Sequence, residues 1–262
     1  MEAILQISAV VFYFLATLHY LLYLVFKNKT IIAKIATVFT SVGFISHTVV
    51  IGVYRCHSGR LPITSRADIV SLFGWAMILA YLIAEWKHGH KIWVFGSFVL
   101  PLAFAAGMYT SFLPHKMEIF PSGTKTVFLT FHVSSASIGF ASFGFAFCLA
   151  IMYLLQERQL KSRHPGSLFF RLPSLDTLDK LSYRCISVGF PIITLSTILG
   201  ILWIWSTRDS VFSWKPVEIW WLMIWFFYAI LLQARFTIGW RGRKASYLTI
   251  FIFLLSCVPL LT

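Results

Sequence analysis

The sequence predicts an all-α membrane protein whose chain crosses the bilayer eight times. Of its 262 residues, 58% are hydrophobic and 12% are charged, whereas a soluble domain has about 45–50% apolar and about 25% charged residues. A helix needs about 20 mostly apolar residues to cross the hydrocarbon. The alternating pattern of barrel strands is absent, so each long apolar run is expected to be a helix. The eight runs lie near residues 4–26, 31–53, 67–86, 92–111, 125–155, 184–206, 217–236 and 245–261.

The Lys and Arg residues are divided unevenly between alternate loops, and this division predicts the orientation of the chain. Fifteen of the 22 lie in or beside the loops that follow the first, third, fifth and seventh runs, which leaves seven for the opposite side. Cytoplasmic loops carry the excess of positive charge, so both termini are expected outside. Topology and attraction to lipid headgroups then explain the net charge of +13, and no nucleic-acid partner is expected. The fifteen are Lys27, Lys29, Lys34, Lys87, Lys91, Arg158, Lys161, Arg163, Arg171, Lys180, Arg184, Arg235, Arg241, Arg243 and Lys244.

The start of the chain predicts a retained membrane protein. The first three residues carry no positive charge and the first apolar run is a full span, so no cleavable signal is expected. We expect a multi-pass protein of the bacterial plasma (inner) membrane, with residues 1–262 forming a single transmembrane domain. Cys148 and Cys185 lie inside runs and behave as small apolar residues. A disulfide between Cys56 and Cys257, both near the outer face, has no further support in the sequence.

Histidines within the apolar runs are a sign of a site. Counting 1.5 Å per residue, His132 lies about 11 Å and His47 about 9 Å below the predicted outer surface, whereas His19 lies about 22 Å below it. Ionisable residues at such depth face the protein interior and often mark a functional site. Gln233 reaches a depth of about 24 Å, close to that of His19. The alternative is that these side chains only hydrogen-bond across helices.

Tryptophans crowd around the loop between the sixth and seventh runs. Their number exceeds what an anchoring belt at one interface usually needs, so we expect a flat apolar group to lie there. Anchoring alone accounts for Trp86, Trp93 and Trp240. The six around the loop are Trp203, Trp205, Trp214, Trp220, Trp221 and Trp225.

Two connections carry further features. The predicted outer loop 54–66 is short and cationic, with His57, Arg60 and Arg66, and Asp68 follows it where a carboxylate is expected to cap the third helix. Before the sixth run, Leu recurs at 175, 178 and 181 with Asp between. This spacing predicts a separate amphipathic helix over 174–181, lying on the inner face.

Several segments resemble the cytochrome c assembly family, which includes the CcsA/ResC, CcmC and HemX types. Residues 178–184 (LDKLSYR) and 189–191 (GFP) resemble the entry to the paired spans of that family. Residues 214–220 (WKPVEIW) resemble its tryptophan-rich loop, and residues 239–242 (GWRG) resemble the inner turn that follows. His132 matches the family's external histidine at the head of a span. The resemblance covers most of the chain.

The resemblance implies haem as the cofactor. Members of the family are polytopic proteins that export or present haem outside for attachment to apocytochrome c. His132 would then be one axial ligand, and His47 is its most economical partner because their predicted depths agree. His57 and His115 are the alternatives in loops, and His19 belongs to a second, inner site.

The remaining haem-binding residues are assigned by the same resemblance and by the chemistry of haem, which needs an apolar slot and cations near its propionates. Aromatic walls and the cationic outer loop supply these surroundings. The assigned residues are Trp214, Trp220, Trp221, Arg60, Arg66 and Glu218.

The expected function is presentation of haem at the outer face, with a membrane partner of cytochrome c assembly or an apocytochrome as the recipient. No constellation of catalytic acid, base or nucleophile is present, and attachment needs only oriented haem and a reduced iron if the acceptor supplies its own thiols. No enzymatic activity is therefore expected. Gln233 stands where the family has an inner-site histidine, and the sequence ends at Thr262, before its second external histidine. The missing external histidine favours one alternative, a HemX-like regulator or assembly factor linked to haem biosynthesis. A haem-bearing subunit of a membrane complex is a further alternative.

Overall fold

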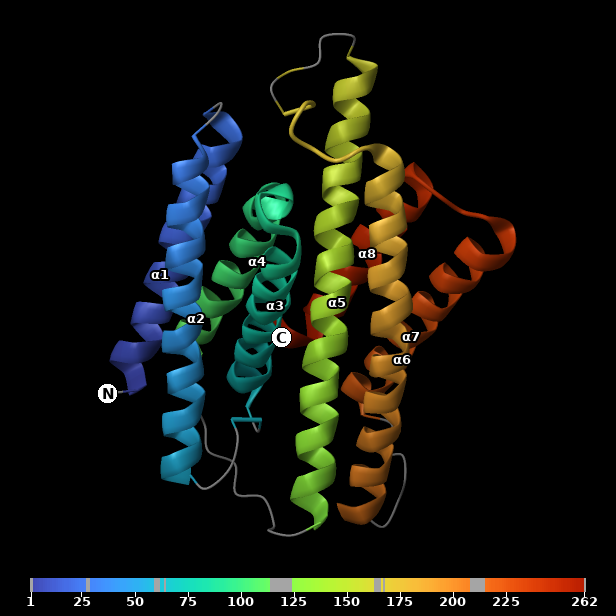
Figure 1. The fold of residues 1–262 in the computed structure, drawn as a ribbon. Coiled ribbons are helices and arrows are strands. Elements are labelled where there is room, and N and C mark those ends of the chain that lie inside the picture. Colours follow the sequence, from blue (N-terminus) through green and yellow to red (C-terminus); the bar gives the residue numbers. More distant parts are fainter. Residues whose placement is uncertain are drawn as a thin grey trace. The chain divides into compact units, whose positions relative to one another are not determined.

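A computed structural model shows an all-helical chain (Figure 1). The structure describes residues 2–26, 29–58, 62–63, 65–113, 124–162, 166, 168–207 and 215–261. Within these ranges there is no β-strand, and eight helices are long and apolar enough to cross a membrane. The predicted fold class and the eight predicted spans are thereby confirmed. The helices are α1 (Glu2–Val25), α2 (Thr30–Ser58), α3 (Arg66–His88), α4 (Trp93–Phe112), α5 (Thr124–Lys161), α6 (Leu175–Thr207), α7 (Pro216–Gln233) and α8 (Arg243–Leu261), with short helical turns η1 (Gly89–Ile92) and η2 (Ala234–Ile238).

Two predicted boundaries are wrong. The predicted amphipathic helix over residues 174–181 is not separate, because α6 continues without interruption from Leu175 to Thr207. Residues 175–181 form the first two turns of α6, the sixth span. The predicted loop 54–66 is also shorter than expected, since α2 continues to Ser58 and carries His57 in its last turn. At the end of α2 and at the start of α6, the helix extends beyond the apolar run that predicted the span.

The start of α3 confirms the predicted capping role of Asp68. The backbone N–H of Asp68 donates to the Ser65 hydroxyl oxygen over 3.1 Å, and the Ser65 N–H donates to the Asp68 carboxylate over 3.0 Å. This reciprocal pair satisfies two of the donors that a helix start leaves without partners. Asp68 is buried.

The chain forms two compact units. Unit 1 contains residues 1–116 and 155–174. In it α1 packs against α2 and α4, and α3 packs against α4 (Figure 1). The segment before α6 is fixed to the end of α1 by Arg171, whose guanidinium donates to the carbonyl oxygens of Tyr23 and Phe26. A cation near a helix C-terminus also favours the negative end of the helix dipole.

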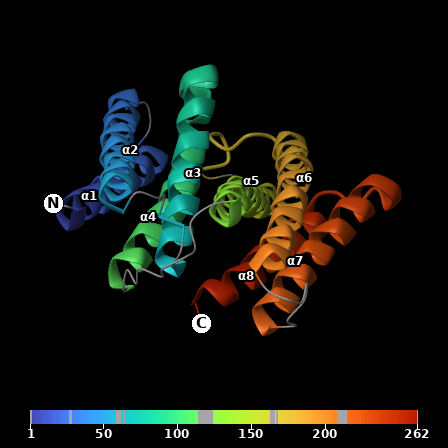
Figure 2. The ribbon, with the colours of Figure 1, turned by 90° about the horizontal axis from the view of Figure 1, so that it is seen from below.

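Unit 2 contains residues 117–154 and 175–262. In it α7 packs against α6 and α8 (Figure 2). Stacked aromatic rings join α5 to α7 and α8: the ring centroids of Phe143 and Tyr228 are 3.7 Å apart and those of Phe140 and Phe253 are 5.2 Å apart. Small residues let α5 and α6 approach, since a Cβ added at Gly139 would lie 2.7 Å from a side-chain carbon of Ile193.

Candidate functional site

His132 lies where α5 meets α6 in unit 2. Its Nδ1 is 2.7 Å from the backbone oxygen of Ser196, and the Ser196 hydroxyl donates to the His132 backbone oxygen over 2.9 Å. Gly200, one turn further along α6, makes room for the ring: a Cβ there would lie 2.8 Å from Cε1 and 2.9 Å from Nδ1 of His132. The imidazole is therefore held in one place by a serine and a glycine of the facing helix.

The same hydrogen bond determines which ring nitrogen of His132 carries the proton. A carbonyl oxygen can only accept, so Nδ1 is the donor and Nε2 of the neutral ring carries the lone pair. Histidines that bind metals in proteins usually have this arrangement, with the second ring N–H donated to a carbonyl or carboxylate. His132 is thus oriented and in the tautomer required for binding iron through Nε2.

His19 and His47 in unit 1 differ from each other in this respect. His19 Nδ1 is 2.8 Å from the carbonyl oxygen of Leu15, in the same helix, which again leaves Nε2 with its lone pair. His47 is buried and uses both nitrogens: Nδ1 lies 3.3 Å from the Tyr13 hydroxyl and Nε2 lies 2.8 Å from the Ser71 hydroxyl. To bind iron, His47 would have to release one of these partners.

The predicted alternative for these histidines, hydrogen bonding across helices, has a counterpart in the structure. His47 links α2 to α1 and α3, and His132 links α5 to α6. Such bonds are compatible with metal binding only where one ring nitrogen remains available. His132 and His47 belong to different units, and so do His19 and Gln233. Both predicted pairings therefore remain predictions.

The tryptophans of α7 contact three different helices. Trp220 donates from Nε1 to the Leu255 carbonyl oxygen in α8 over 3.2 Å. Trp221 lies edge-on to Phe140 of α5, with 6.2 Å between ring centroids. Trp225 donates to the Thr194 hydroxyl of α6 over 2.9 Å. The predicted Trp220 and Trp221 thus take part in helix packing.

The other predicted haem-binding residues are placed as follows. Glu218 is in the first turn of α7, where its carboxylate accepts from the Lys215 N–H over 3.4 Å as part of the helix start. Arg66 is the exposed first residue of α3, and His57 is exposed in the last turn of α2. The predictions for Trp214, Arg60 and His115 lie outside the described residues.

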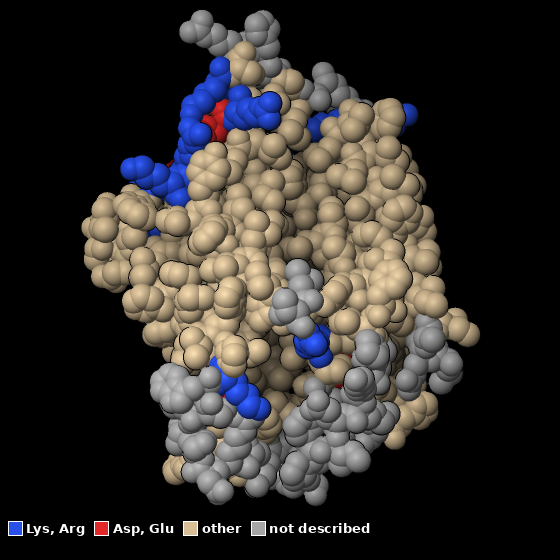
Figure 3. Space-filling model, turned by 180° about the vertical axis from the view of Figure 1, so that it is seen from behind, with Lys and Arg blue, Asp and Glu red and all other residues tan. Residues whose placement is uncertain are grey.

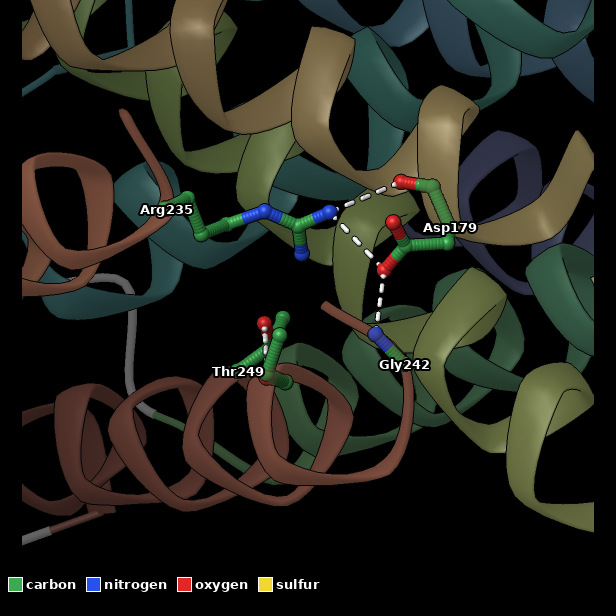
Figure 4. Close-up of polar contacts among 5 residues, drawn as sticks. Asp179, Arg235, Gly242 and Thr249 are labelled. Carbon is green, nitrogen blue, oxygen red and sulfur yellow. Dashed lines mark hydrogen bonds and ion pairs between the residues drawn. The ribbon is translucent and has the colours of Figure 1, made fainter. Parts of the chain in front are cut away.

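A buried ion pair that the sequence analysis missed ties α6 to the region after α7. The carboxylate of Asp179 accepts from the Arg235 guanidinium and from the backbone N–H of Gly242, both over 2.9 Å (Figure 4). The Arg235 side chain is 4% exposed and its guanidinium lies over the Tyr183 ring, 5.1 Å from the centroid. Asp179 and Gly242 belong to two of the segments that resemble the family, so the structure shows why these segments go together. A signal was available in the sequence: Asp179 lies between Leu178 and Leu181 at the start of an otherwise apolar run.

Glu85 is a second residue that the sequence analysis missed. It is buried near the end of α3 and its carboxylate accepts from the Trp93 indole over 2.7 Å, from the Tyr20 hydroxyl over 3.4 Å, and from the Thr37 hydroxyl. These donors come from three other helices of unit 1. The signal would have been a carboxylate inside a predicted span, which is rare in membrane helices.

Cys56 and Cys257 are free thiols that belong to different units, so the disulfide considered from the sequence remains a prediction without support. Among the described residues, no group of three or more His, Cys, Asp and Glu side chains is placed to hold a metal ion.

Comparison with known proteins identifies the family. A family model described as cytochrome C assembly protein matches residues 66–261, three quarters of the chain. The chain belongs to the cytochrome c assembly protein family. The match includes α3 to α8 and therefore His132, the Asp179–Arg235 pair and Glu85.

Individual members of the cytochrome c assembly protein family align along most of their length. The cytochrome c biogenesis protein CcsA of Guillardia theta is 28% identical over 254 residues, which cover 89% of this chain and 83% of the relative. The CcsA protein of Synechococcus elongatus is 26% identical, with 85% and 82% covered. That of Prochlorococcus marinus is 30% identical, with 74% and 69% covered. The chain is thus a multi-pass membrane protein of cytochrome c biogenesis.

Proposed function

We propose that this member of the cytochrome c assembly protein family binds haem through His132 Nε2 and presents it at the outer face of the bacterial plasma membrane. The observation that carries the proposal is the bond from His132 Nδ1 to the Ser196 carbonyl oxygen, 2.7 Å long. It leaves the iron-binding nitrogen neutral and orients the ring. The family to which the chain belongs supplies the link to cytochrome c.

The residues of the chain would hold haem in a defined way. His132 binds the iron, while Ser196 and Gly200 prevent the ring from turning. Haem, when bound, supplies the iron centre and the vinyl groups that are joined to the apocytochrome. The basic residues Arg60 and Arg66 of the predicted outer loop would pair with the propionates, and Trp214 of the tryptophan loop would cover one face.

The second axial ligand would come from one of the other histidines. His47 fits by predicted depth, but its Nε2 must leave the Ser71 hydroxyl before it can bind iron. His57 is exposed at the end of α2 and is the alternative ligand from the predicted outer loop. His19, with Nε2 already carrying the lone pair, remains the candidate for a separate inner haem.

Absorption spectroscopy of the purified full-length protein tests the proposal. The wild type is expected to show a Soret band, and His132→Ala is expected to lose most of it because the iron loses its oriented ligand. His88→Ala, an exposed histidine at the end of α3, is the matched control and should retain the band. An unchanged spectrum in His132→Ala would refute binding through this residue.

The regulatory alternative rests on Gln233, which stands where the family has an inner-site histidine and is exposed on α7. Haem transfer to an apocytochrome distinguishes presentation of haem from the regulatory alternative. The loaded protein is incubated with a reduced apocytochrome that carries a CxxCH motif, and covalent haem is measured by gel staining. Transfer that requires His132 supports presentation, whereas retained haem without transfer favours a sensor or a permanent haem subunit.

A further inference from the structure

Glu85 is an acidic residue inside a membrane span for which the described part of the chain supplies no cation. It lies in the span Arg66–His88 and is 8% exposed. Other acidic side chains near the ends of the helices have a basic partner, and in Figure 3 the acidic atoms at the upper left lie beside Lys and Arg side chains. The described ion pairs are Asp176 with Lys180, Glu157 with Lys161 and Asp179 with Arg235.

The groups that face Glu85 are hydroxyls and one indole. Tyr20 of α1, Thr37 of α2 and Trp93 of α4 contact its two carboxyl oxygens. Tyr81 lies one turn before Glu85 in α3, on the same face of the helix, and its ring is edge-on to that of Tyr20 with 5.8 Å between centroids. Hydroxyls of Tyr and Thr and the indole of Trp carry no charge at neutral pH.

Basic residues of the neighbouring elements have other surroundings. Arg171 donates to carbonyl oxygens at the end of α1, and His19 of α1 is bonded through Nδ1 to the Leu15 carbonyl oxygen. Three more basic residues of α2 and α3 are exposed: Lys34, Lys87 and His88. An ionised Glu85 would therefore be a buried charge without a counter-charge among the described side chains. Such a charge is costly, and a buried acid avoids the cost by keeping its proton.

The hydrogen bonds around Glu85 also need one more proton than the neighbouring hydroxyls supply. Three oxygen–oxygen contacts form a ring: Tyr20 to Thr37 over 3.1 Å, Tyr20 to Glu85 Oε2 over 3.4 Å, and Thr37 to Glu85 Oε1. Each contact requires one hydrogen atom, and each hydroxyl carries one. The Trp93 N–H does not contribute to the ring, because it donates separately to Oε1.

A proton on Oε2 of Glu85 completes the ring. Oε2–H then donates to Tyr20, Tyr20 donates to Thr37, and Thr37 donates to Oε1. An ionised carboxylate leaves one contact with two oxygen atoms and no hydrogen between them. Turning the Thr37 hydroxyl to the Ala33 carbonyl oxygen, 3.1 Å away, would take a donor from the carboxylate without supplying a proton.

We propose that Glu85 is a proton-binding site, held as a neutral carboxylic acid between α1, α2, α3 and α4 of unit 1. The ligand is a single proton taken from water. The site lies one turn before the end of α3, beside Trp86, which is 85% exposed, and the positive-inside rule places this end in the cytoplasm. Carboxyl groups in membrane helices often take part in proton transfer.

Infrared difference spectroscopy of the purified full-length protein at neutral pH tests the proposal. The spectrum of the wild type minus that of Glu85→Gln is expected to show the carbonyl band of one protonated carboxyl group per chain, which moves to lower frequency in D2O. Glutamine has the shape of the neutral acid and likewise one acceptor oxygen and a donor, so the variant can keep the ring. Asp179→Asn is the matched control: Asp179 is also largely buried, 13% exposed, but is paired with Arg235. Its difference spectrum should show ionised carboxylate bands instead.

Two results would overturn the proposal. One is ionised carboxylate bands in the wild type minus Glu85→Gln spectrum, including bands that change when sodium is replaced by choline, which would assign a metal cation to Glu85. The other concerns Tyr20→Phe, which removes the acceptor of the Oε2 proton. The acid band should move to higher frequency in this variant, and an unmoved band would refute the ring. These measurements need no bound haem, so they are independent of the haem site at His132.

Discussion

The three histidines within the helices differ in the ring nitrogens that their hydrogen bonds occupy. His132 and His19 each donate Nδ1–H to a backbone carbonyl, while His47 uses both nitrogens. Because an imidazole binds iron through an unprotonated nitrogen, this difference ranks His132 and His19 above His47 as ligands. Depth in the membrane, which the sequence predicts, does not distinguish them in this way.

Gly200→Ala tests whether the contacts of α6 hold the His132 ring in position. The new methyl group would lie 2.8–2.9 Å from the ring atoms, so the imidazole must shift and its bond to Ser196 must lengthen. Loss of such an orienting contact typically lowers metal affinity about 10- to 100-fold, and haem titration followed by absorption measures it. Gly52→Ala in α2 is the control, because no atom lies within 4 Å of its added Cβ. Equal haem affinity in the two variants would contradict the proposal that Gly200 and Ser196 position the His132 ring for iron.

Glu85→Ala tests the buried carboxylate of unit 1. The change removes the carboxylate that accepts from the Trp93 indole, and an unsatisfied buried donor costs about 1–3 kcal/mol. The Thr37 hydroxyl can turn to the Ala33 carbonyl oxygen, which lies 3.1 Å away. A lower midpoint of thermal unfolding, followed by tryptophan fluorescence, is expected. Glu85→Gln keeps one acceptor oxygen and should lose less. If Glu85→Ala unfolds at the wild-type temperature, the carboxylate does not hold these helices together.

At the scale of elements, the Asp179–Arg235 pair connects α6 to the short turn η2 and, through Gly242, to the start of α8. Gly242 has φ +66°, and a Cβ there would lie 2.6 Å from the Tyr153 hydroxyl. Glycine suits this position for both reasons. The turn between α7 and α8 is thereby attached to α6 and α5 at once.

Asp179→Ala is expected to lower the free energy of unfolding by about 3–5 kcal/mol, because it leaves the buried Arg235 charge without its carboxylate partner. Asp176→Ala removes a neighbouring carboxylate that is 70% exposed and should cost about 0–1 kcal/mol. Unfolding in a denaturing detergent compares the two. The double variant Asp179→Ala/Arg235→Ala should recover part of the loss. Equal effects of the two single variants would show that the buried pair contributes no more than a surface pair.

At the scale of the whole molecule, the charge division predicts that both termini and the loop after α2 face outward. The exposed thiol of Cys56, near the end of α2, provides a natural reporter. A membrane-impermeant maleimide should label it in intact cells, and Cys56→Ser should remove that label. Lys161→Cys, at a position 63% exposed at the end of α5, should be labelled only after the membrane is opened. The reverse result would invert the topology and place the haem site on the cytoplasmic side.

The sequence by itself determined the number of spans, the fold class and the residues most worth testing. The reason is that a bilayer requires about 20 apolar residues in each helix and excludes ionisable groups from it, so both spans and His132, His47 and His19 are visible in a linear pattern. The family segments at 178–184 and 239–242 were visible in the same way. Trp214 and Arg60 remain sequence predictions.

Only the tertiary structure decided what these residues contact. Asp179 and Arg235 are 56 positions apart and Tyr20 and Glu85 are 65 apart, and no periodic pattern pairs residues over such distances. The tautomer of His132 depends on a carbonyl 64 residues away. Hydrophobic patterning acts within one helix, whereas hydrogen bonds act between atoms about 3 Å apart, and the packing of the helices alone brings those atoms together.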